Sequence, residues 1–310
     1  MLKKPGCLVL IVLAFGLLFA GLLVGPLAAQ FVGDKIPAIL KVGQPHVELP
    51  AEALLHFGPV LVTNTLVAAV FTTIVLLLLF VLGTRKMSLV PKGVQNLLEM
   101  VVETLLNFVE SVAGKEHGRT FFPLVAMIFI FVITNAWLSL LPFFGTIVVK
   151  EVVEGHEKLV PVFRGANTDM NVPATLAIMS FVFVEFWGIR SAGFFKYMGK
   201  FIRISSFAPS KFNGLKSVPM TLMMGIIDMF VGLIELVSEL IRLVSFTFRL
   251  FGNMTAGEIL LGISMFLVPW VFSTFFYGME LLIGFIQALI FGGLTVVFAT
   301  LAVASHGEEH

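Results

Sequence analysis

The sequence predicts an all-α protein that crosses a membrane several times. Of its 310 residues, 58% are hydrophobic and 13% are charged, whereas soluble domains carry about 25% charged residues. Several apolar runs reach the length of about 20 residues that a helix needs to cross a bilayer core of about 30 Å. The net charge of +1 and the single cysteine argue against nucleic-acid binding, a disulfide framework and a thiolate metal site.

Six apolar segments are candidates for membrane-spanning helices. They cover residues 7–29, 60–83, 121–144, 172–192, 219–267 and 275–304. We therefore expect five or six transmembrane helices, depending on the fate of the first segment. The fifth segment is too long for one upright span, and Pro219 suits a first helical turn. We expect it to form a long tilted helix that pairs with the sixth segment as a C-terminal helical hairpin.

The first segment has two interpretations. Two lysines precede its apolar run, and glycine, proline and alanine residues follow, which is typical of a signal peptide with a cleavage region. The same run is long enough to stay in the membrane as an extra transmembrane helix. Both interpretations remain open, and in either case we divide the chain into an N-terminal part, 1–58, and a membrane domain, 59–310.

Basic residues predict the orientation of the loops. Lysine and arginine are concentrated in loops 84–120 and 190–217, which places these two loops on the cytoplasmic side. Loop 145–171 contains fewer basic residues, among them Arg164, and they are offset by acidic ones. We therefore expect this loop on the opposite side.

Segment 93–113 has a different pattern from the apolar runs. Leu98, Val101 and Leu105 follow helical spacing, and glutamates lie on another face. This pattern predicts an amphipathic helix at the cytoplasmic interface or packed on the helix bundle.

The last two apolar segments contain ionisable residues, which at membrane depth indicate function. They include Glu235, Glu239, Arg242, Arg249, Glu258 and Glu280. Intervals of 4, 3, 7 and 4 residues separate the first four and Asn253, so that these five share one helix face. Glu258 is rotated away from that face, farther along the same helix.

An antiparallel hairpin predicts which residues lie at equal depth, because their numbers then have a nearly constant sum. On this basis Arg249 lies level with Gln287, and Glu258 lies level with Glu280. Arginine stays protonated and cannot relay a proton, whereas carboxylates can. Acids on both sides of a fixed cation therefore suggest a proton path that Arg249 interrupts.

Arg249 has no predicted acidic partner at its own depth. An unpaired arginine at the membrane centre costs about 2.5–3.5 kcal/mol on insertion scales, so we expect its anion on another protein. Gly252, Gly257 and Gly262 keep the helix thin, which suits close approach by a helix of that protein. Packing within the chain is the alternative explanation for these glycines.

The stretch RLFGNMTAGE at 249–258 resembles the signature of subunit a of F-type ATP synthases. ITNAWLSLLP at 133–142, TDMNVPATLA at 168–177 and FIQALIFGGLTVVF at 285–298 resemble the same family in the same order. The resemblance implies a proton-translocating stator subunit beside a ring of c subunits, with peripheral-stalk b subunits, in a bacterial inner membrane. It implies no cofactor and no metal, and no enzymatic activity for this chain on its own.

The resemblance also implies residue roles. Arg249 is similar to the essential cation that faces the rotor carboxylate, with Asn253 and Gln287 near it. Residues similar to the outer half-channel are Glu258, Glu280, Asp169, Asn171 and Asn64. Residues similar to the inner half-channel are Glu235, Ser238 and Arg242, and Glu239 is an additional acid there.

The sequence departs from the family pattern in the outer half. Many bacterial members have a histidine at the position of Glu280, and some have an aspartate at Asn64 and Ser139. The titration of the outer path is therefore expected to differ.

Three further interpretations follow from the residues. A self-contained transporter would normally show repeated halves with broken helices, and no such repeat is visible. A membrane enzyme would need a nucleophile, metal or cofactor motif, and none is visible; the histidines lack ligand spacing. Glu185 is expected to pair with Arg190 at the inner boundary.

Overall fold

The computed structural model describes residues 13, 15–17, 19–20, 50–57, 60–153, 156–201, 218–268 and 271–304. The chain forms two compact units, and four of its described helices contribute residues to both. Unit 1 comprises Met1–Val75, Val132–Asp169 and Leu250–Gln287, and unit 2 comprises Leu76–Phe131, Met170–Arg249 and Ala288–His310.

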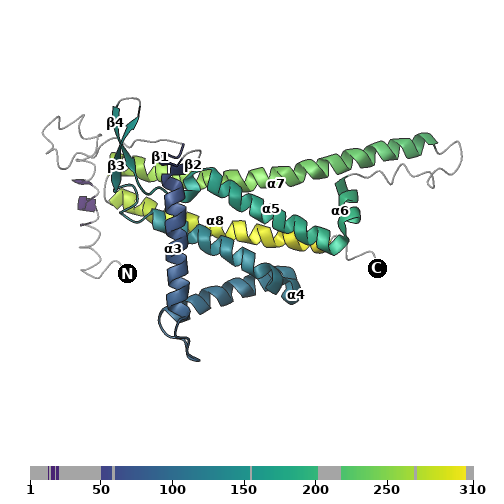
Figure 1. Ribbon diagram of the computed structural model, residues 1–310, viewed down its shortest axis with the longest axis horizontal. Helices are drawn as coiled ribbons and strands as arrows, with labels where there is room; N and C mark the ends of the chain where they lie inside the picture. Colours follow the sequence, from purple (N-terminus) through teal and green to yellow (C-terminus); the bar gives the residue numbers. More distant parts are fainter. Residues whose placement is uncertain are drawn as a thin grey trace. The chain divides into compact units, whose positions relative to one another are not determined.

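Helices dominate the described residues (Figure 1). They are α3 (Asn64–Thr84), α4 (Val94–Ser139), α5 (Asn171–Ala192), α6 (Phe194–Phe201), α7 (Val218–Leu267) and α8 (Val271–Ala304). Helices α3, α4 and α5, together with Phe272–Ala304 of α8, are long and apolar enough to cross a membrane. The chain is therefore a multi-pass membrane protein. The first predicted segment, 7–29, lies mostly outside the described residues, so the count of five or six spans stays a prediction.

The apolar helices leave many large hydrophobic side chains exposed. On α3, for example, Leu77 and Leu82 are exposed, whereas Ala68 and Thr72 are buried. Such a distribution suits a helix whose solvent is lipid, because the backbone polar groups are satisfied inside the helix and the apolar side chains need no protein cover.

Helix α4 contains the predicted amphipathic helix and one predicted span. Gly114 (φ 75°, ψ 166°) interrupts the helical backbone, so the amphipathic segment ends there, as expected. The helix that follows ends at Ser139, before the expected end at 144. Pro142 explains the early end, because the residue before a proline is disfavoured in the helical conformation.

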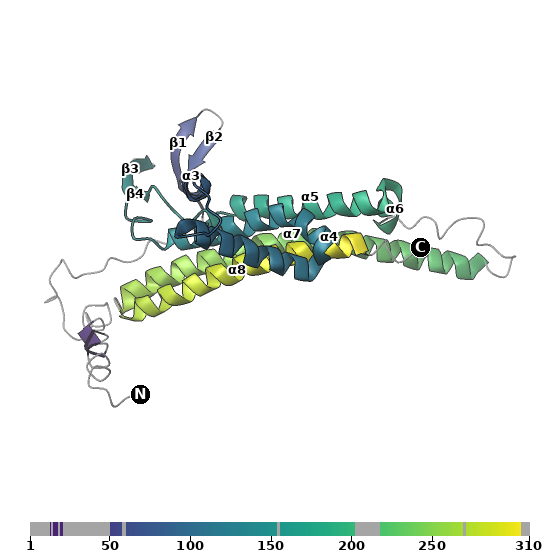
Figure 2. The same ribbon diagram turned by 90° about the horizontal axis from the view of Figure 1, so that it is seen from below.

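Two small antiparallel sheets accompany the helices of this mainly α-helical chain. Strand β1 (Ala53–Phe57) pairs with β2 (Val60–Thr63), and β3 (Val148–Val153) pairs with β4 (His156–Pro161). Both hairpins belong to unit 1, and Figure 2 shows them near the start of α3. Valine-rich runs of this length favour strands, but the apolar content of the chain concealed them among the helical segments.

In unit 2, helices α4, α5 and α8 share one apolar core, and α7 packs on α8. Phe121, Val184 and Val296 are among the residues buried in its centre. The Ser180 hydroxyl lies 2.7 Å from that of Thr295, and Thr295 donates its own proton to the Phe291 carbonyl. Ser180 of α5 therefore donates to α8. The Phe246 ring of α7 lies 4.9 Å, centroid to centroid, from that of Phe291.

In unit 1, aromatic rings and one polar contact join α3 to the end of α4 and to loop 145–171, which we name the outer loop for its expected side. The rings of Phe71, Phe143, Phe144 and Phe163 lie 5.2–6.4 Å apart, centroid to centroid. The buried Asn135 amide donates to the Thr72 hydroxyl at 3.0 Å. The rings hold the loop against α3, and the Asn135–Thr72 contact holds α3 against α4, which lines the cavity described below.

We expect Gly114→Ala to destabilise the protein by roughly 1–3 kcal/mol, because only glycine adopts this backbone conformation without strain. A Cβ atom at position 114 would meet open space, so the effect isolates the backbone. The measurement is the thermal inactivation of the purified complex. Gly199→Ala is the matched control, since that glycine also faces open space but lies within α6 at a negative φ. Equal stability of the two variants would contradict the prediction.

Candidate functional site

Polar side chains of unit 2 gather where α6 meets α7. The Lys200 ammonium of α6 lies 3.1 Å from a Glu235 carboxylate oxygen and 3.2 Å from one of Glu239. Arg242 lies 2.7 Å from the other oxygen of Glu239, and Glu239 is buried. The three α7 residues therefore share one face, as the spacing predicts.

Lys200 is the residue of this cluster that sequence reasoning missed. In the sequence it is one of several basic residues in loop 190–217. Its partner Glu239 lies 39 residues away in the chain. The turn at Gly193 (φ 83°) leads directly into α6, which Figure 1 shows turned against the end of α5. Two acids thus meet two cations in this cluster.

The predicted pair of Glu185 with Arg190 is wrong. Glu185 accepts a hydrogen bond from the Tyr197 hydroxyl of α6, and the Arg190 guanidinium lies 5.2 Å from the centroid of the Trp187 ring. A Cβ atom on Gly188 would overlap the Tyr197 ring, so the missing side chain makes room for it. Burial, and then the hydrogen bond to Glu185, raise the pKa of Tyr197, so the hydroxyl remains a donor.

Arg249 forms no ion pair with any described residue of unit 2. Its guanidinium lies 5.9 Å from the centroid of the Phe246 ring on the preceding turn, and the side chain is half-buried. Gln287 is buried and belongs to unit 1, so its predicted level with Arg249 stays a prediction. Asn253 is exposed. Ser238 is exposed as well and donates to the Ile234 carbonyl at 2.8 Å.

The described part of unit 1 contains an open cavity of about 210 Å³. The polar residues that line it are Asn135, Ser139, Arg164, Asn167, Thr168, Glu258, Tyr277 and Glu280. They come from α4, the outer loop, α7 and α8. The cavity therefore brings together Glu258 and Glu280, the two acids predicted to lie at one level.

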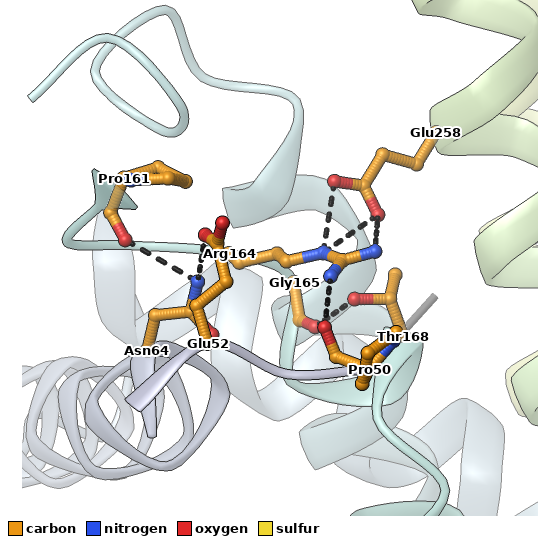
Figure 3. Close-up of polar contacts among 8 residues, drawn as sticks. All are labelled: Pro50, Glu52, Asn64, Pro161, Arg164, Gly165, Thr168 and Glu258. Carbon is orange, nitrogen blue, oxygen red and sulfur yellow. Dashed lines mark hydrogen bonds and ion pairs between the residues drawn. The ribbon is translucent and has the colours of Figure 1, made fainter. Parts of the chain in front are cut away.

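Glu258 is held by Arg164. The Arg164 Nε lies 3.1 and 3.2 Å from the two carboxylate oxygens, and Nη2 lies 3.2 Å from Oε2 (Figure 3). Nη1 donates to the Pro50 carbonyl at 3.2 Å, and the arginine is buried. Sequence reasoning missed this contact because the partners are 94 residues apart and no spacing rule connects a loop arginine to a helix acid.

Glu280 differs from Glu258 in having no cation beside it. The residue is 6% exposed, and no described residue of unit 1 forms an ion pair with it. A Cβ atom on Gly257 would overlap its carboxylate, so Gly257 gives the acid its place against α7. For this glycine, packing within the chain is the correct explanation. Gly252 faces open space.

The other predicted outer residues are not among those that line the cavity. The Asn64 amide donates to Glu52 and to the Pro161 carbonyl, both at 3.3 Å (Figure 3), which fixes the start of α3 to both hairpins. Asp169 accepts from Thr65 at 2.9 Å. Asn171 begins α5 in unit 2 and is exposed. The proton-path roles of these three residues stay predictions.

Asn167 is a cavity residue that the sequence did not suggest. It is 1% exposed, and neither its amide nitrogen nor its oxygen has a partner among the described residues. A buried amide usually has partners, including ordered water. Its position in the lining therefore favours a cavity that can take up polar molecules such as water.

Comparison with known proteins decides the family. The model of the family "ATP synthase A chain" matches residues 65–300. The chain belongs to this family. It is 28% identical to ATP synthase subunit a of Rhodococcus erythropolis over 84% of this chain and 89% of the relative. It is 29% identical to that of Moorella thermoacetica over 82% and 96%, and 31% identical to that of Helicobacter acinonychis over 76% and 87%.

Membership of this family establishes the general role. The chain is a proton-translocating stator subunit of the F-type ATP synthase. It is a component of that complex and does not catalyse a reaction alone. The matched region contains Arg249, the cavity of unit 1 and the acidic cluster of unit 2.

We expect a double-mutant cycle on Glu185 and Tyr197 to give a coupling free energy of about 0.5–3 kcal/mol in stability. Tyr197→Phe leaves a half-buried carboxylate without its donor, because Glu185 Oε1 has no partner in the described residues. Glu185→Leu combined with Tyr197→Phe removes both polar groups, which is close to neutral. Thermal inactivation of the four complexes measures the coupling, and additive effects would disprove it.

Proposed function

We propose that the chain forms two offset proton half-channels, one open to each side of the membrane, with Arg249 between them. The outer half-channel includes the cavity lined by Glu258 and Glu280, with Asp169, Asn171 and Asn64 nearer its mouth. The inner half-channel includes the cluster of Glu235, Glu239 and Arg242, with Ser238 beside it. The observation that carries the proposal is a fixed cation that forms no ion pair with the described residues of its unit, in a helix with acids on either side.

Contacts within each unit support the long hairpin of α7 and α8. In unit 2, Phe246 packs on Phe291, and in unit 1, Gly257 packs on Glu280. The residue numbers of the two pairs have the same sum, as two antiparallel helices require. We propose that the hairpin continues through the membrane, and that the chain has five or six transmembrane helices in a bacterial inner membrane. The division into 1–58 and 59–310 agrees with the family match at 65–300.

We propose that the anion for Arg249 is the carboxylate of a c subunit in the rotor ring. Arginine remains charged, and an unpaired guanidinium at the membrane centre is unfavourable. A side chain at Gly252 would meet open space, which leaves α7 accessible to a second helix near Arg249. Asn253 and Gln287 are the neutral polar residues that we assign to the neighbourhood of Arg249. Peripheral-stalk b subunits are the other partners.

A proton entering from outside passes the outer acids and neutralises the rotor carboxylate. Rotation carries the neutral carboxyl group through the lipid to the inner half-channel. The positive field of Arg249 there favours the carboxylate anion, so the proton leaves toward Glu235 and Glu239. The membrane potential contributes about 2.3 kcal/mol per charge per 100 mV. A fixed cation between the half-channels prevents a direct proton leak.

We expect Arg249→Ala to abolish ATP-driven proton pumping, while passive proton leak through the complex persists or rises. Loss of the cation removes both the attractor for the rotor carboxylate and the barrier between half-channels. Quenching of a pH-sensitive dye in inverted membrane vesicles measures both quantities. Arg85→Ala, which changes an exposed arginine, is the control. Pumping near the normal rate in Arg249→Ala would refute the proposed role.

We expect Gly257→Ala to lower proton pumping by about ten- to a hundredfold, because small displacements of a reacting group have effects of this size. The new methyl group displaces the Glu280 carboxylate, the flexible end of a side chain, so the helix itself should remain intact. Gly278→Ala, two residues from Glu280 on a side facing open space, is the matched control. Pumping assays on vesicles with equal amounts of complex compare the two; equal rates would remove Glu280 from the path.

A further inference from the structure

The two acids of the outer cavity have unlike electrostatic surroundings. Arg164 binds Glu258 through two nitrogens at 3.1–3.2 Å, whereas no described residue of unit 1 forms an ion pair with Glu280. The other titratable group in the lining is Tyr277, and the α4 residues there, Asn135 and Ser139, carry no charge. The two carboxylates look alike in the sequence, but Arg164 forms an ion pair with only one of them, Glu258.

Arg164 needs a permanent counter-ion. It is 8% exposed, and a guanidinium does not lose its proton in proteins. A proton moving onto Glu258 would leave this buried cation uncompensated, which is strongly unfavourable. Glu258 is the better solvated partner, with 44% of its side chain exposed, so solvent reduces this penalty but does not replace the two-pronged contact.

Glu280 can accept and release a proton without breaking an ion pair. It is 6% exposed, it lies against Gly257, and it lines the same cavity as the unpartnered amide of Asn167. Polar cavities of this size hold water when polar groups lack other partners. Water bound beside Asn167 would give protons a route to Glu280.

We propose that Arg164 is a positioning residue of the outer half-channel, which holds Glu258 as a fixed anion and leaves Glu280 as the carboxyl group that exchanges protons. This inference rests on the proposed function. Arg164 also contacts the Pro50 carbonyl at 3.2 Å, so its guanidinium joins the segment before β1, the outer loop and α7 at the cavity. The bidentate geometry requires arginine, since lysine cannot reproduce it.

A rescue experiment separates a fixed anion from a proton carrier. The variants are Glu258→Gln, Arg164→Gln, the double variant Arg164→Gln/Glu258→Gln, and Glu280→Gln with and without Arg164→Gln. Each is expressed in the complete ATP synthase, and ATP-driven proton pumping in inverted vesicles is measured against pH. ATP hydrolysis and the amount of assembled complex normalise the rates.

We expect either single change in the Arg164–Glu258 pair to lower pumping by about tenfold or more, because one buried partner is left unpaired. The double variant should recover to within about threefold of the unchanged protein and keep its pH profile, since neutral partners replace the pair. Glu280→Gln should abolish proton pumping, both alone and together with Arg164→Gln. Arg164→Lys should fall between the unchanged protein and Arg164→Gln.

Two further variants complete the test. Arg119→Gln breaks an exposed ion pair with Glu110 at 3.1 Å and should leave pumping unchanged. The charge exchange Arg164→Glu/Glu258→Arg restores a pair in the opposite sense, and it decides the matter if the neutral double variant does not assemble. Failure of both double variants to restore pumping overturns the role of Arg164, and so does pumping by Glu280→Gln. The proposed function is tested separately by the Arg249→Ala variant.

Discussion

A buried charge must have a partner, and this constraint organises both units of the protein. Removing an ion from water is expensive, and an opposite charge repays the cost only with good geometry. Unit 1 meets the constraint by bringing Arg164 from the outer loop to Glu258 on α7. Unit 2 meets it by bringing Lys200 from α6 to Glu235 and Glu239. In both cases a short segment outside the apolar spans supplies the cation.

The same constraint gives meaning to the groups that remain. Within the described residues of its own unit, Arg249 forms no ion pair, and the same holds for Glu280 in the other unit. A cation and an acid of this kind are costly unless another molecule or a proton supplies the missing charge. The chain belongs to the ATP synthase A chain family, and we propose that the cost is tolerated because a proton-translocating subunit needs groups whose charge is completed only during turnover.

Glycines set the distances on which these contacts depend. Gly257 allows the Glu280 carboxylate to lie against α7, and Gly188 allows the Tyr197 ring to lie against α5. In each case a Cβ atom would occupy the place of the neighbouring group. A sequence pattern of small residues predicts close approach, but it does not say whether the approaching group is a lipid, another subunit or a side chain of the same chain.

The sequence by itself determined the membrane class and the amphipathic segment before Gly114. It also determined that Glu235, Glu239 and Arg242 share one helix face, and that Glu258 and Glu280 come together from two helices. These follow from composition, helical period and antiparallel geometry, which are local or nearly local rules. Tertiary structure alone decided the partners of the charges. Arg164 and Lys200 meet acids 94 and 39 residues away, and β3 pairs with β4 within loop 145–171. Coulomb attraction acts through space and has no period along the chain, so only the folded positions of loop and helix determine which carboxylate is paired and which stays without a cation.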